Sequence, residues 1–553
     1  MISRKVATFG VILGSLALAV SAHAESKRYL VQFKSPKTFQ SVAQTVTHNT
    51  ASAPGVMAPM RLFNSDAVVA QTLNNIEMLV IESEDGRAVE SLRHHPAVGL
   101  VEEEVFFPAP RPMATWGTQA VANTIPQGEQ NRPWGIDAVR APQAWSVTEG
   151  DSARVLVLDT GLDRQHPALA SNFEKGQNFT GGDSSDINDT IGHGTHVSGT
   201  ILASGLNGGL VGVAPRAKLL MGKVCADRGC SSVAIANGID WAVEQKVDVV
   251  NMSLGGAFLT EAQAKALEKA EQAGVLVVAA SGNDGDSKVS YPAAAPTVLA
   301  VGAIDINLKK AEFSNWGPEL AVMGPGVDVL SSVPRGAGRG ALVKADIDGK
   351  GLTDIKSLPF VGSPVASANS NEVVFGNLGK PEELTKAGVR GKLVLLSRGE
   401  LSFKEKVANA IRAGAAGVVI YNNAPGLVQG AISEDGSEVA IPAAMIEQAS
   451  GEGLRQALQS GKLVRLSLVV ARMDYAAFQG TSMATPHVAG VAALVRAANH
   501  KLTPAQVRSL LKSTATPLSP NGNNEMGSGL VNAEKAVSQA ASVAFYGVQQ
   551  AAN

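Results

Sequence analysis

Cysteine is nearly absent from this 553-residue chain, which contains only Cys225 and Cys230. Two cysteines without a cluster of histidines provide too few ligands for a metal site. The net charge is only −2 at pH 7, so electrostatic attraction does not favour a DNA or RNA partner. Beyond the N-terminal residues, no run approaches the roughly 20 uninterrupted apolar residues of a membrane helix. These absences argue against a metalloprotein, a nucleic-acid binder and an integral membrane protein.

Residues 1–24 have the layout of a secretory signal peptide. Arg4 and Lys5 precede the apolar stretch VATFGVILGSLALAV, and the small residues of the tripeptide AHA follow at 22–24. We expect cleavage after Ala24, secretion to the extracellular space rather than the periplasm, and a mature protein outside the membrane. The alternative is an N-terminal anchor, but the stretch is short for a span. In an exported chain, Cys225 and Cys230 are expected to form a disulfide, with two free thiols as the alternative.

Apolar patterns divide the remaining chain into parts of different type. Residues 25–112 contain the short strands RYLVQF and IEMLVIES and a helix at AVESLRHH, which is typical of a ferredoxin-like α+β sandwich. From Trp134 onward, continuous apolar runs alternate with helical patterns. Continuous runs indicate strands covered on both faces, and so a parallel α/β sheet. The runs are RVLVLD, KLLMGKV, VDVVNMS, GVLVVAAS and TVLAVGAID.

Polar residues stand at the ends of several of these elements, where ligands bind in open parallel sheets. Asp159 ends one strand, Asn283 follows another, and His193 and Ser482 each begin a helical pattern. Taken singly, each has a structural explanation as a helix cap or turn residue. His193 and His196 are spaced as metal ligands are, but the motif lacks the acidic residue of HExxH.

Together, the motifs resemble those of the subtilisin-like serine proteases. The matching stretches include VLDTGLDRQHP, GHGTHVSGT, NMSLGG, ASGNDG and GTSMATPHVAG, in the order of the family, over residues 133–334 and 474–533. The resemblance implies an α/β fold with a central parallel sheet and helices on both faces. It also implies a serine endopeptidase that hydrolyses protein or peptide substrates through an acyl-enzyme and has no catalytic cofactor.

The resemblance assigns a role to each polar residue. A serine hydroxyl is a weak nucleophile until a base removes its proton. Ser482 would be the nucleophile, His193 the base, and Asp159 the residue that orients the imidazole. The side-chain amide of Asn283 and the N–H of Ser482 would hold the oxyanion.

Two other functions compete with this interpretation. The sequence GTSMA approximates the nucleophile elbow of α/β-hydrolases, and His487 and His500 follow Ser482 as that class requires. However, no long buried strand leads into Ser482, and the acid and base motifs precede it. The other alternative is a secreted, non-enzymatic binding protein on the same scaffold.

The resemblance also implies where a substrate peptide binds. The segment at 253–256 would pair with the substrate main chain as an added strand. Gly255 and the segment at 280–282 would line a P1 pocket for a large apolar side chain, whereas Asp284 favours a basic one. The implied substrate-binding residues are Ser253, Leu254, Gly255, Gly256, Ala280, Ser281 and Gly282.

Residues 25–112 resemble the inhibitory propeptide of the same family. Their C-terminal tail, around FFPAPRPMATWGTQ, would block the cleft until cleavage frees the enzyme, so the protein would be an autoprocessed zymogen. An ordinary accessory domain is the alternative. The catalytic domain would then comprise residues 113–337 and 474–553.

The intervening residues 338–473 are a large departure from the simplest family members. The stretch GVRGKLVLLSRGELSFKEKVANAIRAGAAGVVIYNN resembles a protease-associated domain, with a strand, a helix and a second strand. Since both ends of the insertion lie near Ser482, we expect the domain to sit by the cleft and to help admit or select protein substrates. A passive insertion is the alternative.

A structural calcium ion is a further expectation from the resemblance. Gln130 and Asn207 are its candidate ligands. Ala168, however, occupies the position of an acidic ligand, and loss of a carboxylate weakens a site for a hard cation.

Overall fold

The computed structural model describes residues 26–51, 61–110, 113–114, 132–370, 372–428, 430–433, 437–518 and 524–551. The chain divides into two compact units. The first is Met1–Thr72 with Glu77–Glu103, and the second is Leu73–Ile76 with Glu104–Asn553. The predicted signal peptide and Gln130 lie outside the described residues. Within the described ranges, no helix is both long and apolar enough to cross a bilayer.

The first unit is a four-stranded antiparallel sheet with two helices. The strand order β2-β3-β1-β4 and the element order βαββαβ are those of the ferredoxin-like fold. Asp85 caps the second helix by accepting a hydrogen bond from the N–H of Arg87. The first helix and β2 were not predicted from the sequence. The elements are β1 (Lys27–Phe33), α1 (Pro36–Ala51), β2 (Val68–Leu73), β3 (Met78–Ser83), α2 (Gly86–Arg93) and β4 (Val98–Glu103).

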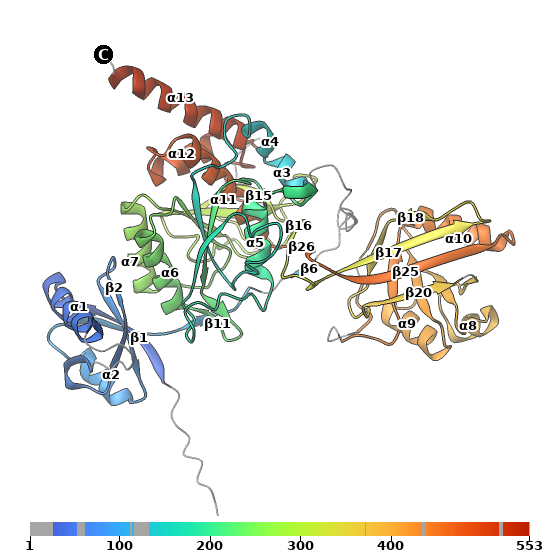
Figure 1. The fold of residues 1–553 in the computed structure, drawn as a ribbon, viewed down its shortest axis with the longest axis horizontal. Helices are drawn as coiled ribbons and strands as arrows, with labels where there is room; N and C mark the ends of the chain where they lie inside the picture. Colours follow the sequence, from blue (N-terminus) through green and yellow to red (C-terminus); the bar gives the residue numbers. More distant parts are fainter. Residues whose placement is uncertain are drawn as a thin grey trace, which may run out of the picture. The chain divides into compact units, whose positions relative to one another are not determined.

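A seven-stranded parallel sheet forms the centre of the second unit, in the order β15-β14-β13-β12-β7-β9-β8 (Figure 1). The five continuous apolar runs form its inner strands and are almost completely buried, which confirms the predicted α/β class. The strands are β7 (Arg154–Asp159), β8 (Phe173–Asn178), β9 (Lys218–Lys223), β12 (Val249–Met252), β13 (Leu276–Ala280), β14 (Val298–Ile304) and β15 (Leu320–Pro325).

Helices cover both faces of this sheet. Figure 1 shows α5 and α11 packed together on one face, with α6 and α7 side by side on the other. The sheet therefore fixes the first turns of α5 and α11, from which His193 and Ser482 project. The helices of this part are α3 (Trp134–Ala138), α4 (Ala141–Ala144), α5 (His193–Leu202), α6 (Ser232–Glu244), α7 (Glu261–Gln272), α11 (Thr481–Ala498), α12 (Pro504–Thr514) and α13 (Ala533–Ala551).

Two short sheets lie beside the central one. β5 (Phe106–Phe107) pairs with β11 (Gly229–Ser231), which in turn pairs with β10 (Cys225–Ala226). β26 (Tyr475–Gln479) pairs with β16 (Val329–Ser332) on one edge and with β6 (Met113–Ala114) on the other. β26 leads directly through Gly480 into α11.

The inserted residues form two further sheets with their own apolar clusters. One sheet has the order β18-β17-β25-β20 and the other β19-β24-β23-β22-β21. Helix α9 begins at Ser402, whose hydroxyl accepts from the N–H of Glu405 while that carboxylate accepts from Ser402, a capping box. The elements are β17 (Gly338–Ile347), β18 (Thr353–Ile355), β19 (Ser357–Pro359), β20 (Ala366–Ser370), β21 (Val373–Phe375), α8 (Pro381–Ala387), β22 (Leu393–Ser397), α9 (Phe403–Arg412), β23 (Gly417–Tyr421), β24 (Ala443–Ile446), α10 (Gln448–Gln459) and β25 (Val464–Met473).

Candidate active site

The end of β7 places Asp159 against the first residue of α5. Oδ1 of the fully buried Asp159 accepts hydrogen bonds from Nδ1 of His193 at 2.8 Å and from the N–H of Thr160 at 2.8 Å. With Nδ1 donating to the carboxylate, Nε2 of His193 is the nitrogen available as a base. The sequence thus brings together an acid and an imidazole that lie 34 positions apart.

Asp189 fixes the loop that presents His193. Its Oδ1 accepts from the N–H of Gly192 at 2.7 Å and from Oγ1 of Thr160 at 2.9 Å. Its Oδ2 accepts from the N–H and Oγ1 of Thr195 at 2.9 and 2.7 Å. The sequence motifs did not predict this role for Asp189. The one available signal is that an acidic residue stands four positions before His193.

Ser482 lies in the first turn of α11, behind Gly480. Gly480 has φ of 144°, a left-handed conformation that favours glycine. Oγ of Ser482 donates to the carbonyl of Ser253 at 3.1 Å, and Oγ of Ser253 donates to the carbonyl of Ser482 at 2.8 Å. No hydrogen bond among the described residues joins Oγ of Ser482 to His193. The structure therefore ties the serine to the end of β12.

Asn283 and Ser482 present two donors to one region of space. Oδ1 of Asn283 accepts from the N–H and Oγ1 of Thr481 at 2.8 and 2.9 Å, which leaves its Nδ2 turned away from Thr481. A methyl group placed on Gly480 would lie 3.6 Å from both Nδ2 of Asn283 and the N–H nitrogen of Ser482. In the described part of the structure, neither nitrogen has an acceptor, so both are available to an oxyanion. Thr481 was not singled out in the sequence.

A cleft of about 540 Å³ opens beside Ser482. The predicted substrate-binding residues line it, with the exception of Ser281. Ser281 is fully buried, and its hydroxyl donates to the carbonyl of Asn315 at 3.0 Å. Charged side chains also border the cleft, so it is not a purely apolar slot. Its lining comprises Pro108, Ala109, Pro110, Ser253, Leu254, Gly255, Gly256, Ala257, Ala280, Gly282, Asn283, Asp284, Asp286, Lys288, Val289, Ser290, Asn315, Thr481 and Ser482.

The segment after Glu103 forms part of the wall of this cleft. Phe106 and Phe107 pair with Ser231 and Cys230 as an antiparallel strand. The Phe107 ring lies so close to Gly256 that a Cβ there would clash at 2.3 Å. The following residues, 108–110, then line the cleft alongside Ser482.

The remaining histidines of this part have structural contacts. Nε2 of His196 lies 2.9 Å from the carbonyl of Val329, and its ring stacks on Phe478. Burial lowers the pKa of His196 to about 3 and that of His487 to about 4, so both are neutral near pH 7. Nδ1 of His487 contacts the carbonyl of Met483 at 2.9 Å. These contacts give neither His196 nor His487 a ligand-binding role.

His500, the second histidine of the α/β-hydrolase alternative, is half exposed. Its Nε2 lies 3.0 Å from Oγ of Ser152, and its Nδ1 lies 3.6 Å from a carboxylate oxygen of Asp248. Neither His487 nor His500 has a hydrogen bond to Ser482 among the described residues. The geometry therefore does not assemble that alternative site.

Cys225 and Cys230 face each other across the β10–β11 hairpin and form a disulfide. The calcium prediction has less support. Asn207 is exposed and offers one amide oxygen, while Ala168 packs with Ala203 and Leu210 in an apolar cluster. Ca²⁺ takes about six to eight oxygen ligands, so these described residues do not make up a calcium site. Within the described ranges, no cluster of acidic, histidine or cysteine residues fits a metal ion.

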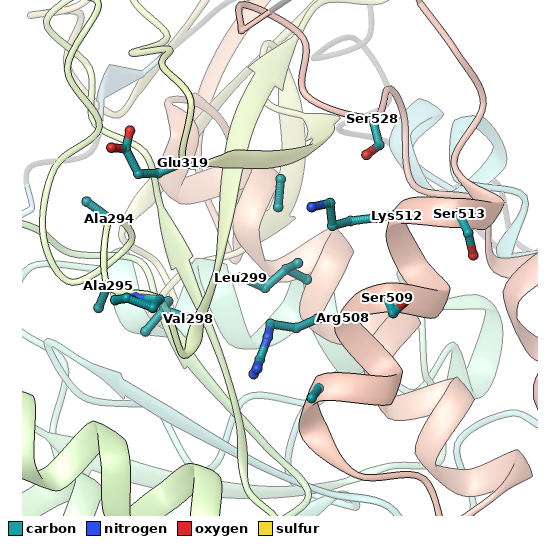
Figure 2. A pocket seen from close by; sticks show the side chains of 13 residues that line it. Ala294, Ala295, Val298, Leu299, Glu319, Arg508, Ser509, Lys512, Ser513 and Ser528 are labelled. Atoms are coloured by element: carbon teal, nitrogen blue, oxygen red, sulfur yellow. The ribbon is translucent and has the colours of Figure 1, made fainter. Parts of the chain in front are cut away.

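A second hollow, of about 740 Å³, contains none of the candidate site residues. Figure 2 shows Glu319 and Lys512 at opposite sides of it, with Arg508 between helix α12 and the sheet. Arg508 is already paired, through Nη1 and Nη2, with the carboxylate of Glu271 at 2.6 and 2.9 Å. This hollow was not predicted from the sequence.

Comparisons with known proteins agree with the predicted family. The subtilase family profile matches residues 150–351 and 449–529, and a PA domain profile matches residues 359–454. The major intracellular serine protease of Bacillus subtilis is 45% identical over 213 residues, which cover 36% of this chain and 67% of that protein. Subtilisin E of Bacillus subtilis is 34% identical over 326 residues, covering 58% of this chain and 77% of that protein.

A solved structure shows the same likeness in three dimensions. The crystal structure of the psychrophilic subtilisin-like protease Apa1 from the Antarctic psychrotroph Pseudoalteromonas sp. AS-11 is 32% identical. It aligns with a TM-score of 0.56 over 74% of this chain and 97% of that one. The fold and these relatives define a serine-type endopeptidase that acts on protein substrates. The chain belongs to the subtilase family and carries an inserted PA domain, as the sequence motifs indicated.

Proposed function

We propose that this protein is a secreted endopeptidase that uses Asp159, His193 and Ser482 as its catalytic triad. The 2.8 Å hydrogen bond between the buried Asp159 and His193 carries this proposal, together with the position of Ser482 at the cleft. His193 takes the proton of Ser482 as its hydroxyl attacks the peptide carbonyl, and returns it to the leaving amine. Asp159 holds the imidazole tautomer and stabilises the imidazolium form.

The oxyanion of the tetrahedral intermediate is held by the two free donors beside Gly480. The amide of Asn283 is aimed by Thr481, whose N–H and hydroxyl both bind its Oδ1. The N–H of Ser482 supplies the second hydrogen bond from the first turn of α11. Because neither donor has to reorganise, both stabilise charge as it develops.

The protein is made as a zymogen, and the segment that follows Glu103 is its inhibitor. Residues 106–107 add a strand to β11, and residues 108–110 line the cleft beside Ser482. A substrate that enters the cleft along the same path would compete with this segment. Cleavage of the chain near the end of the segment frees the cleft. The predicted signal peptide at 1–24 supplies export.

Labelling with a serine-directed phosphonate tests the triad. The processed wild-type protein should incorporate the label, and Ser482→Ala should not. Ser146→Ala is the matched control, since Ser146 is exposed and, among the described residues, its hydroxyl donates to the nearby carbonyl of Gln143 and to no other group. Absence of labelling in the processed wild-type protein would favour a binding protein on this scaffold. The same Ser482→Ala chain should keep its full length, whereas the wild type should shorten.

A further inference from the structure

The strands β25 and β26 run from Val464 to Gln479 with a bend at Asp474, and their two edges are used unequally. One edge pairs with β17 and β16. On the other edge, β20 covers residues 466–470 and β6 covers residues 478–479. Between them, residues 471–477 have no strand partner on this edge within the described structure.

An unpaired edge presents N–H and C=O groups that can bind another extended chain. Among residues 471–477, Arg472 is exposed, Ala477 is buried and the other five are partly exposed. The carbonyls of Asp474 and Ala476 already contact His166 and His196, so the groups open to a chain belong to the other residues. β6 shows the kind of chain that fits beside this edge. Met113 lies opposite Gln479 and Ala114 opposite Phe478, in antiparallel pairing.

The chain direction identifies which part of a substrate would reach this edge. Phe106 and Phe107 lie on β11, residues 108–110 line the cleft with Ser482, and β6 then lies on β26. A chain that follows this path therefore has its upstream part on β11 and its downstream part on β26. Continued beyond Ala114 in the same pairing, it would pass residues 477 to 471 and reach β20 at the base of the inserted domain.

We propose that residues 471–477 are a binding edge for the substrate chain downstream of the scissile bond. This rests on the proposed peptidase function. The inserted domain contributes to substrate binding through β25, because β25 lengthens the edge beyond the end of β26. Main-chain pairing does not depend on side chains, so the edge selects substrates with a long extended segment after the cleavage point rather than a particular sequence.

The test compares two peptides that share every residue up to two positions after the scissile bond. The long one continues for about eight more residues, enough to pass the free edge at one residue per partner. We expect kcat/KM of the processed enzyme to be about tenfold higher for the long peptide, since several net hydrogen bonds form. A control extension of equal length and charge, with proline at every second position, should give no gain.

Main-chain N-methylation of the long peptide, one residue at a time, gives a second measurement. Donors of a strand face one neighbour at every second residue, so the losses in kcat/KM should alternate along the extension. Equal kcat/KM for the long, short and proline-containing peptides would overturn the proposal, and so would losses without alternation. If neither the long nor the short peptide is cleaved, the peptidase function itself fails and the proposal falls with it.

Discussion

Acidification should destabilise the catalytic part of this protein through two buried histidines. His196 and His487 are both fully buried, and burial lowers their pKa values to about 3 and about 4, from an ordinary 6.5. Between about pH 6.5 and about pH 4, the unfolded chain binds two protons that the folded chain does not. Stability is therefore fully present above pH 6.5 and is lost as the pH falls toward the folded pKa values.

The size of the effect follows from these values. Between pH 7 and pH 5, each histidine removes about 2 kcal/mol from the free energy of unfolding, so the pair removes about 4 kcal/mol. This is a large part of the roughly 5–15 kcal/mol that stabilises a typical domain. The loss should appear above the pH range in which most carboxylates titrate. Asp240 is the exception, because burial raises its pKa to about 6, and its protonation offsets part of the loss in this window.

The loss can be measured by urea unfolding at pH 7 and pH 5, followed by tryptophan fluorescence. The Ser482→Ala variant is used as the parent so that the protein does not digest itself. His487→Gln should lower stability at pH 7 but should lose about 2 kcal/mol less between pH 7 and pH 5 than its parent. Ser146→Ala is the control, because Ser146 is exposed and does not titrate between these pH values, and it should leave the difference between them unchanged. An unchanged pH difference in His487→Gln would refute the reasoning.

Three further predictions concern the cleft and its edge. Asn283→Leu should lower kcat about 10²–10³-fold with little change in KM, because one oxyanion donor is lost; a change confined to KM in steady-state kinetics would contradict this. Thr481→Val should lower kcat about tenfold, because one hydrogen bond that aims the Asn283 amide is removed; equal kinetics to the wild type would argue against that aiming role. Cys225→Ser should lower the free energy of unfolding in urea by about 2 kcal/mol, a modest loss because the loop closed by the disulfide is short. This difference between the variant and the wild type should vanish when both are measured under reducing conditions.

Much of the fold could be predicted because the strands are buried on both faces. Continuous apolar runs marked β7, β9, β12, β13 and β14 and placed Asp159 at a strand end. The edge strand β8, with the sequence FEKGQN, was missed because half-exposed residues break the apolar pattern. Helix α1 was missed for the same reason. Among its described side chains, Phe39 and Ala43 are buried and the others are at least partly exposed.

The candidate site was predictable where a residue acts within a local motif. Contacts between distant segments were not. Asp284 and Asn315 are joined by a hydrogen bond from the Asp284 N–H to Oδ1 of Asn315 at 2.8 Å, across 31 positions. Ser281 is buried against the same residue, because its hydroxyl donates to the carbonyl of Asn315. Nothing in the local sequence distinguishes Ser281 from Ala280 and Gly282, which line the cleft. The free edge at 471–477 depends on which strands pair, and this is set by tertiary packing.

The disulfide between Cys225 and Cys230 has a practical consequence for anyone who handles this enzyme. It ties β10 to β11, and β11 is the strand to which residues 106–107 attach. A reducing agent in a purification buffer should therefore make the β10–β11 hairpin, with which residues 106–107 pair, less rigid while leaving Ser482 chemically unchanged. If the proposed function is right, an assay run with reductant should therefore report a higher KM while Ser482 itself is unchanged.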